Sequence, residues 1–315
     1  MSTPSQQNIE KTILENYIEY QFFFVEFQSK FLLSLYSRYQ SVESGNLVLY
    51  FAKETHQNIL RKRDYDFNFD ISFEKFWENH SQINPQRVSI IKIGEDTHLP
   101  KETARRKILQ LIKQKVLNKK NRNIGWLPSE QYKQSYNSIA GNEIENVGKL
   151  TSFICEKINL SVFKKEITEE IQKKFSYYWF HYLGAQLEYL KLWRKQLNDL
   201  ELGLIFLQIA HVFTAKIKEK NISHEDLYND PSLLKGFISA SVSATSVSDT
   251  TTIPIATCVR KLEILVQLKL ISKDQITKRY YMNFALDSLI SQTIKKKMVK
   301  IFSNFFFICI RGVKS

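Results

Sequence analysis

The stretch IGEDTHLPKETARRKILQLIKQKVLNKK, residues 93–120, carries the pattern that decides the fold. Apolar side chains at Ala104, Ile108 and Leu111 recur at helical spacing, and most of the basic side chains lie off that stripe. Pro100 suits the first turn of a helix, because the amide hydrogen that proline lacks would have no partner there. The stretch therefore predicts a helix that opens at Leu99-Pro100, after a short helix over 89–95 and a turn over 96–98.

A basic hairpin is predicted directly after this helix. Val116 and Leu117 begin an extended run, residues 119–123 form a polar turn, and residues 124–127 return before Pro128 ends the run. Two short strands around a basic tip are typical of the wing of a winged helix–turn–helix. In that motif one helix braces a second, which offers its polar N-terminal end to a DNA groove.

The same pattern occurs twice in the chain. Residues 88–126 align with residues 242–280 at a constant offset of 154, without a gap and with ten identical positions. The apolar positions also agree in type, as at Ile108 and Leu262. The second copy predicts helices over 243–249 and 253–268, and strands over 270–273 and 278–282.

The sequence before each copy repeats in the same order. Aromatic-rich helical patterns cover 8–40 and 163–198, apolar segments cover 47–60 and 200–217, and short acidic and aromatic pieces cover 73–78 and 224–228. We therefore expect a mainly α fold, built as a tandem duplication of a helical segment followed by a winged helix–turn–helix with a short two-stranded wing.

The predicted domains are 1–135 and 136–315, each with a helical segment and a winged-helix unit, and the second with a C-terminal helix. Residues 133–148 collect Asn, Ser and Gly and are predicted to be the linker. Alternatively they are helical, because Ile144, Val147 and Leu150 recur at helical spacing.

The charge of the chain favours a polyanionic partner. The net charge is +13 and the pI is near 9.4. Residues 85–133 carry a net charge of +8 and residues 236–300 carry +6, so the excess lies on the two repeated segments. Phosphate neutralisation supplies most non-specific DNA affinity and needs basic groups on one surface.

Other residue types narrow the class of protein. The three cysteines are scattered, which favours a reducing cytoplasm over a disulfide framework. The six histidines lack metal-ligand spacing, and no phosphate loop or nucleophile motif is found, so we expect neither an enzyme nor a cofactor or metal site. With no signal peptide pattern and no run of about 18 apolar residues, we expect no membrane span and a cytoplasmic, nucleoid-associated location.

The quoted stretch resembles the winged-helix segment of bacterial transcriptional regulators of the GntR and MarR type. Ile93-Gly94 matches the first conserved pair, Thr103–Arg106 the start of the second helix, Leu111 a later leucine and Val116-Leu117 the first strand. His98 departs from the family pattern, which usually has Gly in the turn.

The resemblance implies a set of DNA-contacting residues on the second helix and the wing. In the first copy they are Lys101, Thr103, Arg105, Arg106, Lys107, Lys120 and Arg122. The corresponding candidates in the second copy are Thr257, Arg260, Lys261, Lys278 and Arg279. The second copy also carries Ile255, Ala256, Cys258 and Val259 where polar groups are expected. The second copy would therefore contact only the phosphates of the DNA backbone, or would serve mainly as a packing partner.

The sequence predicts a DNA-binding protein, a transcriptional regulator with two winged-helix units in one chain. Double-stranded DNA is the expected partner, met by a homodimer or by a pseudo-dimer within one chain. The alternatives are RNA binding or a protein-assembly role. The aromatic helices are predicted to form core or dimer interface rather than base-stacking surfaces. Residues 294–310 form either a packing helix or a basic helix that lies on a membrane.

Overall fold

The computed structural model describes residues 4–83, 89–220, 240–282 and 289–314. It is 76% helical, with 13 helices in the described ranges. Two antiparallel two-stranded hairpins complete the described secondary structure. The expectation of a mainly α protein is confirmed. The acidic and aromatic piece predicted over 224–228 lies outside the described residues.

Four helices precede the first repeated segment: α1 (Gln6–Glu15), α2 (Tyr17–Tyr39), α3 (Val42–Tyr65) and α4 (Phe76–Ser81). The aromatic pattern over 8–40 is thus two helices, α1 and α2, with a break near Asn16. α2 ends at Gln40, whose φ of 53° is left-handed and whose amide bonds to the carbonyl oxygen of Tyr36. A left-handed residue with this bond is a common way to end a helix.

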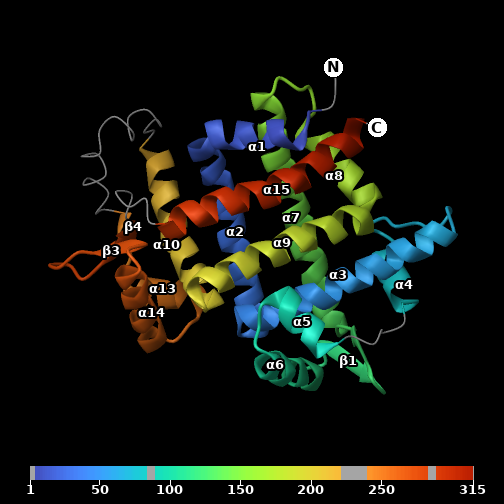
Figure 1. Ribbon diagram of the computed structural model, residues 1–315, viewed down its shortest axis with the longest axis horizontal. Helices are drawn as coiled ribbons and strands as arrows, with labels where there is room; N and C mark the ends of the chain where they lie inside the picture. Colours follow the sequence, from blue (N-terminus) through green and yellow to red (C-terminus); the bar gives the residue numbers. More distant parts are fainter. Residues whose placement is uncertain (1–3, 84–88, 221–239, 283–288, 315) are drawn as a thin grey trace. The chain divides into compact units, whose positions relative to one another are not determined.

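The first helix–hairpin segment comprises α5 (Ile90–Thr97), α6 (Lys101–Lys113), β1 (Leu117–Lys120) and β2 (Asn123–Trp126), seen in blue-green at the bottom of Figure 1. In its hairpin Leu117 faces Trp126 and Lys120 faces Asn123. The second helix–hairpin segment comprises α13 (Ala244–Thr251), α14 (Ile255–Gln267), β3 (Ile271–Lys273) and β4 (Tyr280–Met282). All eight elements lie within two or three residues of the sequence-based bounds.

The remaining helices are α7 (Glu130–Lys157), α8 (Lys164–Lys173), α9 (Phe175–Leu197), α10 (Leu200–Glu219) and α15 (Leu289–Lys314). α7 runs straight through residues 133–148, so the linker prediction is wrong and its helical alternative is confirmed. The reason is packing: Ile144, Val147 and Leu150 are each at most 1% exposed, and this apolar stripe outweighs the local Asn, Ser and Gly.

The chain forms two compact units that do not follow the predicted halves 1–135 and 136–315. Unit 1 contains residues 1–15, 43–195 and 298–315, and unit 2 contains 16–42 and 196–297. In unit 2, α2 packs on α10, and Gln208 donates a hydrogen bond to the backbone oxygen of Ser29. In unit 1, Lys53 of α3 lies 5.2 Å from the ring centre of Phe180 of α9. Each unit therefore takes a long helix from the other half of the sequence.

The aromatic residues serve mainly as core. In α2 the side chains of Phe24, Phe27 and Phe31 are 2–3% exposed, as expected for packing. In α9 Tyr182 and Tyr189 contact Phe305 and Phe302 of α15 at centroid distances of 5.6 and 5.7 Å. The packing-helix prediction for residues 294–310 is thereby confirmed. By length and composition α10 could also cross a membrane, but 67% of its most apolar window is buried.

Candidate nucleic-acid interface

The second helix of the first segment, α6, has one buried face and one cationic face. Ala104, Ile108 and Leu111 are at most 2% exposed and fix the helix on the core of unit 1. Lys101, Arg105 and Arg106 are exposed on the other side, as predicted, and Thr103 is half-buried. None of these three cations forms an ion pair with a described residue. Their charges therefore remain available for an anionic partner.

A left-handed residue sets the turn before α6. His98 has a φ of 55° and its amide bonds to the carbonyl oxygen of Gly94. The left-handed region favours glycine, so His98 is an unusual residue at this position. Pro100 then stands as the N-terminal cap of α6, with extended backbone angles.

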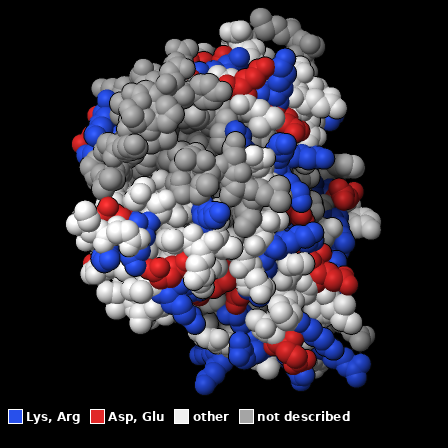
Figure 2. Space-filling view, turned by 60° about the vertical axis from the view of Figure 1, so that its left-hand side comes forward, with Lys and Arg blue, Asp and Glu red and all other residues white. Residues whose placement is uncertain are grey.

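The hairpin β1–β2 adds a second group of cations. Leu117 and Trp126 are at most 4% exposed and anchor its base, while Lys119, Lys120 and Arg122 are exposed near its tip. Figure 2 shows Lys and Arg side chains projecting at the lower edge of the drawn face, the level at which α6 and β1 lie in Figure 1. The predicted wing residues Lys120 and Arg122 are thus on the surface.

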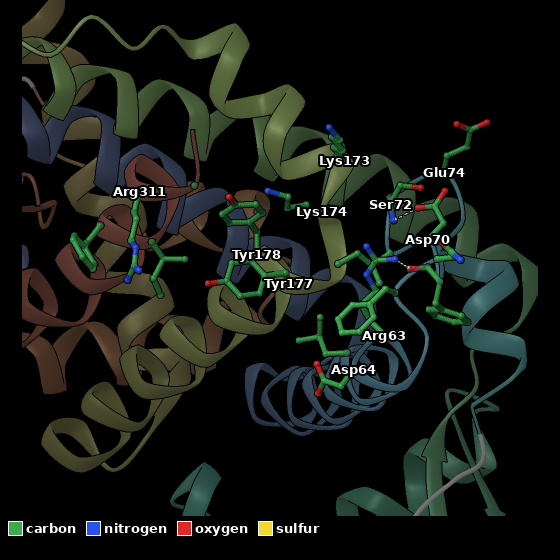
Figure 3. Close-up of a pocket in the computed structure, with 18 residues that line it drawn as sticks. Arg63, Asp64, Asp70, Ser72, Glu74, Lys173, Lys174, Tyr177, Tyr178 and Arg311 are labelled. Carbon is green, nitrogen blue, oxygen red and sulfur yellow. Dashed lines mark hydrogen bonds between the residues drawn. The ribbon is translucent and has the colours of Figure 1, made fainter. Parts of the chain in front are cut away.

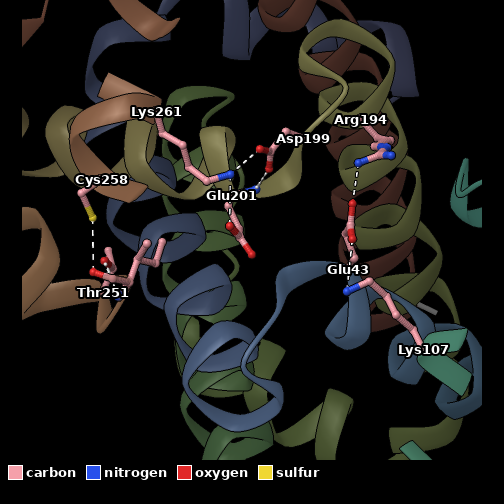
Figure 4. A network of polar contacts seen from close by, with 9 residues as sticks. Glu43, Lys107, Arg194, Asp199, Glu201, Thr251, Cys258 and Lys261 are labelled. Carbon is pink, nitrogen blue, oxygen red and sulfur yellow. Dashed lines mark hydrogen bonds and ion pairs between the residues drawn. The ribbon is translucent and has the colours of Figure 1, made fainter. Parts of the chain in front are cut away.

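Lys107 is a different case from its neighbours on α6. Its ammonium group lies 3.2 Å from Glu43 Oε2, and only 14% of its side chain is exposed. The other carboxylate oxygen of Glu43 lies 2.5 Å from Arg194 of α9 (Figure 4). Lys107 therefore ties α6 to α3 and α9 within unit 1, and the prediction that it is an exposed DNA-contacting residue is wrong.

Lys261 of α14 was also predicted to face DNA, and this is wrong. It is 4% exposed and its ammonium group pairs with Asp199 and, at 3.1 Å, with Glu201 Oε2 (Figure 4). Asp199 caps the N-terminus of α10 by accepting a hydrogen bond from the Glu201 amide. A lysine next to two carboxylates at a helix start is held by charge pairing, not presented to solvent.

The outer face of α14 is apolar where that of α6 is cationic. Ile255 and Val259 are 49% and 41% exposed, and Ala256 lies beside them. Arg260 is exposed on this helix, Thr257 is half-buried and Cys258 is fully buried. The expectation that Cys258 lies on the exposed side is wrong, because its thiol packs against the Ile253 carbonyl oxygen at 3.4 Å.

The hairpin of the second segment keeps two exposed cations, Lys278 and Arg279. The guanidinium of Arg279 donates a hydrogen bond of 2.7 Å to the backbone oxygen of Ser241, and this bond holds the Arg279 side chain in place. The turn is closed by Asp274, whose carboxylate accepts bonds from the amide and the hydroxyl of Thr277 at 2.6 Å. Ile276 stands at the tip and is 91% exposed.

Two glutamates were missed by the sequence analysis. Glu43 and Glu201 are each the second residue of a long helix, α3 and α10. Glu43 forms an ion pair with Lys107, the seventh residue of α6, and Glu201 forms one with Lys261, the seventh residue of α14. The repeated order of segments was the only signal in the sequence, and it does not indicate that these glutamates approach those lysines.

Two histidines lie buried in the aromatic core of unit 1. Burial lowers the pKa of His56 to about 3 and that of His80 to about 4. The ring of His56 stacks on Phe76, and His80 Nε2 bonds to the backbone oxygen of Trp126 at 2.7 Å. Both histidines are structural, and the described residues contain no group of three or more His, Cys, Asp or Glu side chains that could hold a metal ion.

No protein family, curated protein or solved structure matches this chain.

Proposed function

We propose that this protein binds double-stranded DNA through the first helix–hairpin segment and acts as a transcriptional regulator. The observation that carries the proposal is the cationic face of α6, where Lys101, Arg105 and Arg106 are exposed without ion-pair partners among the described residues. Exposed cations with no partner in the fold can displace the counterions of a phosphate backbone, and the gain in entropy drives binding.

The order of elements supports a winged helix–turn–helix. A short helix, a left-handed turn at His98, a second helix and an antiparallel hairpin follow one another in the first segment. In this motif the second helix enters the major groove and the wing reaches the flanking backbone. Arg105 and Arg106 lie in the first half of α6, the half that meets base edges in such proteins, while Lys120 and Arg122 lie on the wing.

Equal helix lengths support a tandem duplication. α1 and α8 each have 10 residues and α2 and α9 each have 23, and each second copy starts 158 residues after the first, Lys164 after Gln6 and Phe175 after Tyr17. Gln40 and Asn198, which follow α2 and α9, are both left-handed, with φ of 53° and 57°.

The helix–hairpin segments support the same duplication at the sequence offset of 154. Left-handed residues recur at equivalent positions, His98 and Thr252 with φ of 55° and 60°, and Lys115 and Lys269 with φ of 58° each. Such residues are uncommon outside glycine, so their repetition argues against two unrelated segments. On this proposal the chain is a pseudo-dimer that carries both units itself.

The two copies have diverged in their outer faces. The positions of Lys101 and Arg105 in α6 are occupied by Ile255 and Val259 in α14. Base contacts are therefore assigned to α6 of the first segment, and the second segment contributes Arg260, Lys278 and Arg279 as contacts to the phosphates of the DNA backbone. The exposed apolar side chains of α14 favour a second candidate, a protein-assembly role for that segment.

A competition experiment separates the candidates. The full-length protein is titrated into a labelled mixed-sequence duplex at moderate salt, and unlabelled duplex DNA, structured RNA or neutral dextran is added. We expect duplex DNA to compete best and dextran not at all. Stronger competition by RNA would favour the RNA-binding alternative, and no binding of the duplex would contradict the proposal.

A further inference from the structure

The exposed face of α6 carries a single carboxylate, that of Glu102, among its cations. Glu102, Arg106 and Leu109 follow one another at intervals of four and three residues, so they form a stripe along one side of the helix. Glu102 and Arg106 are exposed and Leu109 is 53% exposed, so this stripe lies opposite the buried side of α6. Glu102 therefore lies on the same outward side as Arg106, the side that the DNA-binding proposal turns toward the duplex.

Several acidic side chains of unit 1 have partners within the chain. Asp70, which lines the cleft shown in Figure 3, accepts a hydrogen bond of 2.8 Å from the amide of Ser72. Glu43 pairs with two cations. The carboxylate of Glu102, in contrast, forms no ion pair or hydrogen bond with any residue that the structure describes, although Arg106 lies one turn away. This carboxylate therefore remains able to accept hydrogen bonds from a bound partner.

A carboxylate on a DNA-binding face opposes binding unless it meets a hydrogen-bond donor, because the phosphates repel it. An ionised carboxylate only accepts hydrogen bonds, and the base groups that donate them in the major groove are the amino groups of cytosine and adenine. Adenine also presents the acceptor N7 beside its amino group, whereas cytosine presents the amino group alone. The carboxylate of Glu102 therefore suits cytosine better than any other base.

The second helix–hairpin segment lacks this carboxylate. At the constant offset of 154, Ala256 of α14 stands at the position of Glu102, while Arg260 stands at the position of Arg106. The cation of the stripe is thus present in both copies, but the acceptor is present only in α6. A base preference that depends on this acceptor therefore belongs to the first segment.

We propose that Glu102 is a specificity-determining residue, which accepts a hydrogen bond from the amino group of a cytosine while Arg106 donates to a guanine nearby. This inference rests on the proposed binding of duplex DNA and adds the bases that α6 selects. Four residues of a helix span about 6 Å and base pairs are about 3.4 Å apart, so the two contacts fall on base pairs about one or two steps apart.

Selection from a random duplex library tests the proposal. The full-length protein and its variants Glu102→Gln and Glu102→Ala each select duplexes, and the enriched sites are sequenced. We expect the unchanged protein to enrich a C·G pair at one position. At the same position Glu102→Gln should enrich an A·T pair, because an amide matches both N6 and N7 of adenine, and Glu102→Ala should show no preference. The other positions of the site should be the same in all three proteins.

Fluorescence anisotropy on the selected site then measures the preference. The unchanged protein should bind the site with cytosine at this position about tenfold more tightly than the same site with adenine, and Glu102→Gln should reduce or reverse that ratio. Glu156→Gln, which removes an exposed carboxylate of α7, should keep the ratio of the unchanged protein. Both positions are exposed, so folding should be retained, as circular dichroism would verify.

The outcomes separate this inference from the function on which it rests. If the unchanged protein and Glu102→Gln bind duplexes but select the same sites, the inference is overturned while duplex binding stands. A carboxylate that acts only on the helix dipole would give that result, since its loss alters helix stability and not base preference. If neither protein retains any duplex, the proposed DNA binding is contradicted, and this inference with it.

Discussion

The ammonium group of Lys261 lies 3.1 Å from the carboxylate of Glu201, and only 6% of the lysine side chain is exposed. The equivalent pair in unit 1, Lys107 and Glu43, has a separation of 3.2 Å. In each unit this ion pair holds a helix of the helix–hairpin segment against the start of a long helix. Lys107 holds α6 against α3, and Lys261 holds α14 against α10. In unit 1 this internal ion pair fixes the position of α6, the helix that carries the exposed cations Lys101, Arg105 and Arg106.

Replacing Lys261 should destabilise the protein more than replacing Lys107. Lys261→Met leaves Asp199 and Glu201 close together without their cation, which should cost about 2 kcal/mol, less than a fully buried pair because both carboxylates are partly exposed. Lys107→Met should cost about 1 kcal/mol, because Arg194 still pairs with Glu43. Urea unfolding of both variants measures this, and equal losses would contradict the difference.

Two helical glycines should respond in opposite directions to alanine. At Gly312 an added Cβ would lie 1.7 Å from the hydroxyl oxygen of Tyr178, so Gly312→Ala should displace the end of α15 and destabilise the protein by about 1–3 kcal/mol. At Gly141 an added Cβ would meet no atom within 4 Å beyond its chain neighbours and the backbone of its own helix, so Gly141→Ala should stabilise α7 by about 0.5–1 kcal/mol. Thermal unfolding distinguishes the two, and a shift in the same direction would refute the packing described.

Stability should fall on mild acidification because of His56 and His80. Their folded pKa values lie below the ordinary value of 6.5, so below that pH the unfolded chain binds protons that the folded chain does not. Stability is then lost as the pH falls from 6.5 toward about 4, by about 1.5 kcal/mol per histidine between pH 6.5 and about pH 5.

The histidine contribution is isolated by substitution. His80→Gln keeps a group that can donate to the backbone oxygen of Trp126 but does not titrate. Its urea midpoint should therefore depend less on pH than that of the unchanged protein. The same pH dependence in both proteins would show that His80 does not contribute.

The two halves of the chain should fold only together. α2 belongs to unit 2 and α9 to unit 1, so each half alone lacks a long helix on which its own core packs. Residues 1–160 and 161–315, expressed separately, should have low helix content by circular dichroism, and their co-expression should restore it as a complex. Native helix content in one half alone would contradict the exchange of helices.

The sequence predicted local elements better than their assembly. Periodicity at Ala104, Ile108 and Leu111 located α6, and the internal alignment located α13, α14 and the second hairpin within two or three residues. The sequence-based prediction was wrong for Lys107 and Lys261, because a sequence pattern does not distinguish an exposed lysine from a paired one. Only the fold brings Glu43 and Glu201 beside these lysines. The sequence-based prediction also failed for the units, because packing of α2 on α10 is a long-range contact that no local pattern reports.

The central claim is that the cations of α6 bind duplex DNA, and fluorescence anisotropy tests it most directly. Binding of a labelled duplex is measured at several salt concentrations for the unchanged protein, for Arg105→Ala with Arg106→Ala, and for Lys149→Ala with Lys195→Ala. The last variant also removes two exposed cations, one from α7 and one from α9.

We predict that the unchanged protein and the Lys149/Lys195 control bind with similar affinity, which falls steeply with salt. The Arg105/Arg106 variant should bind at least about tenfold more weakly, with a salt slope smaller by about 2. An Arg105/Arg106 variant that binds the duplex as tightly as the unchanged protein would contradict the account.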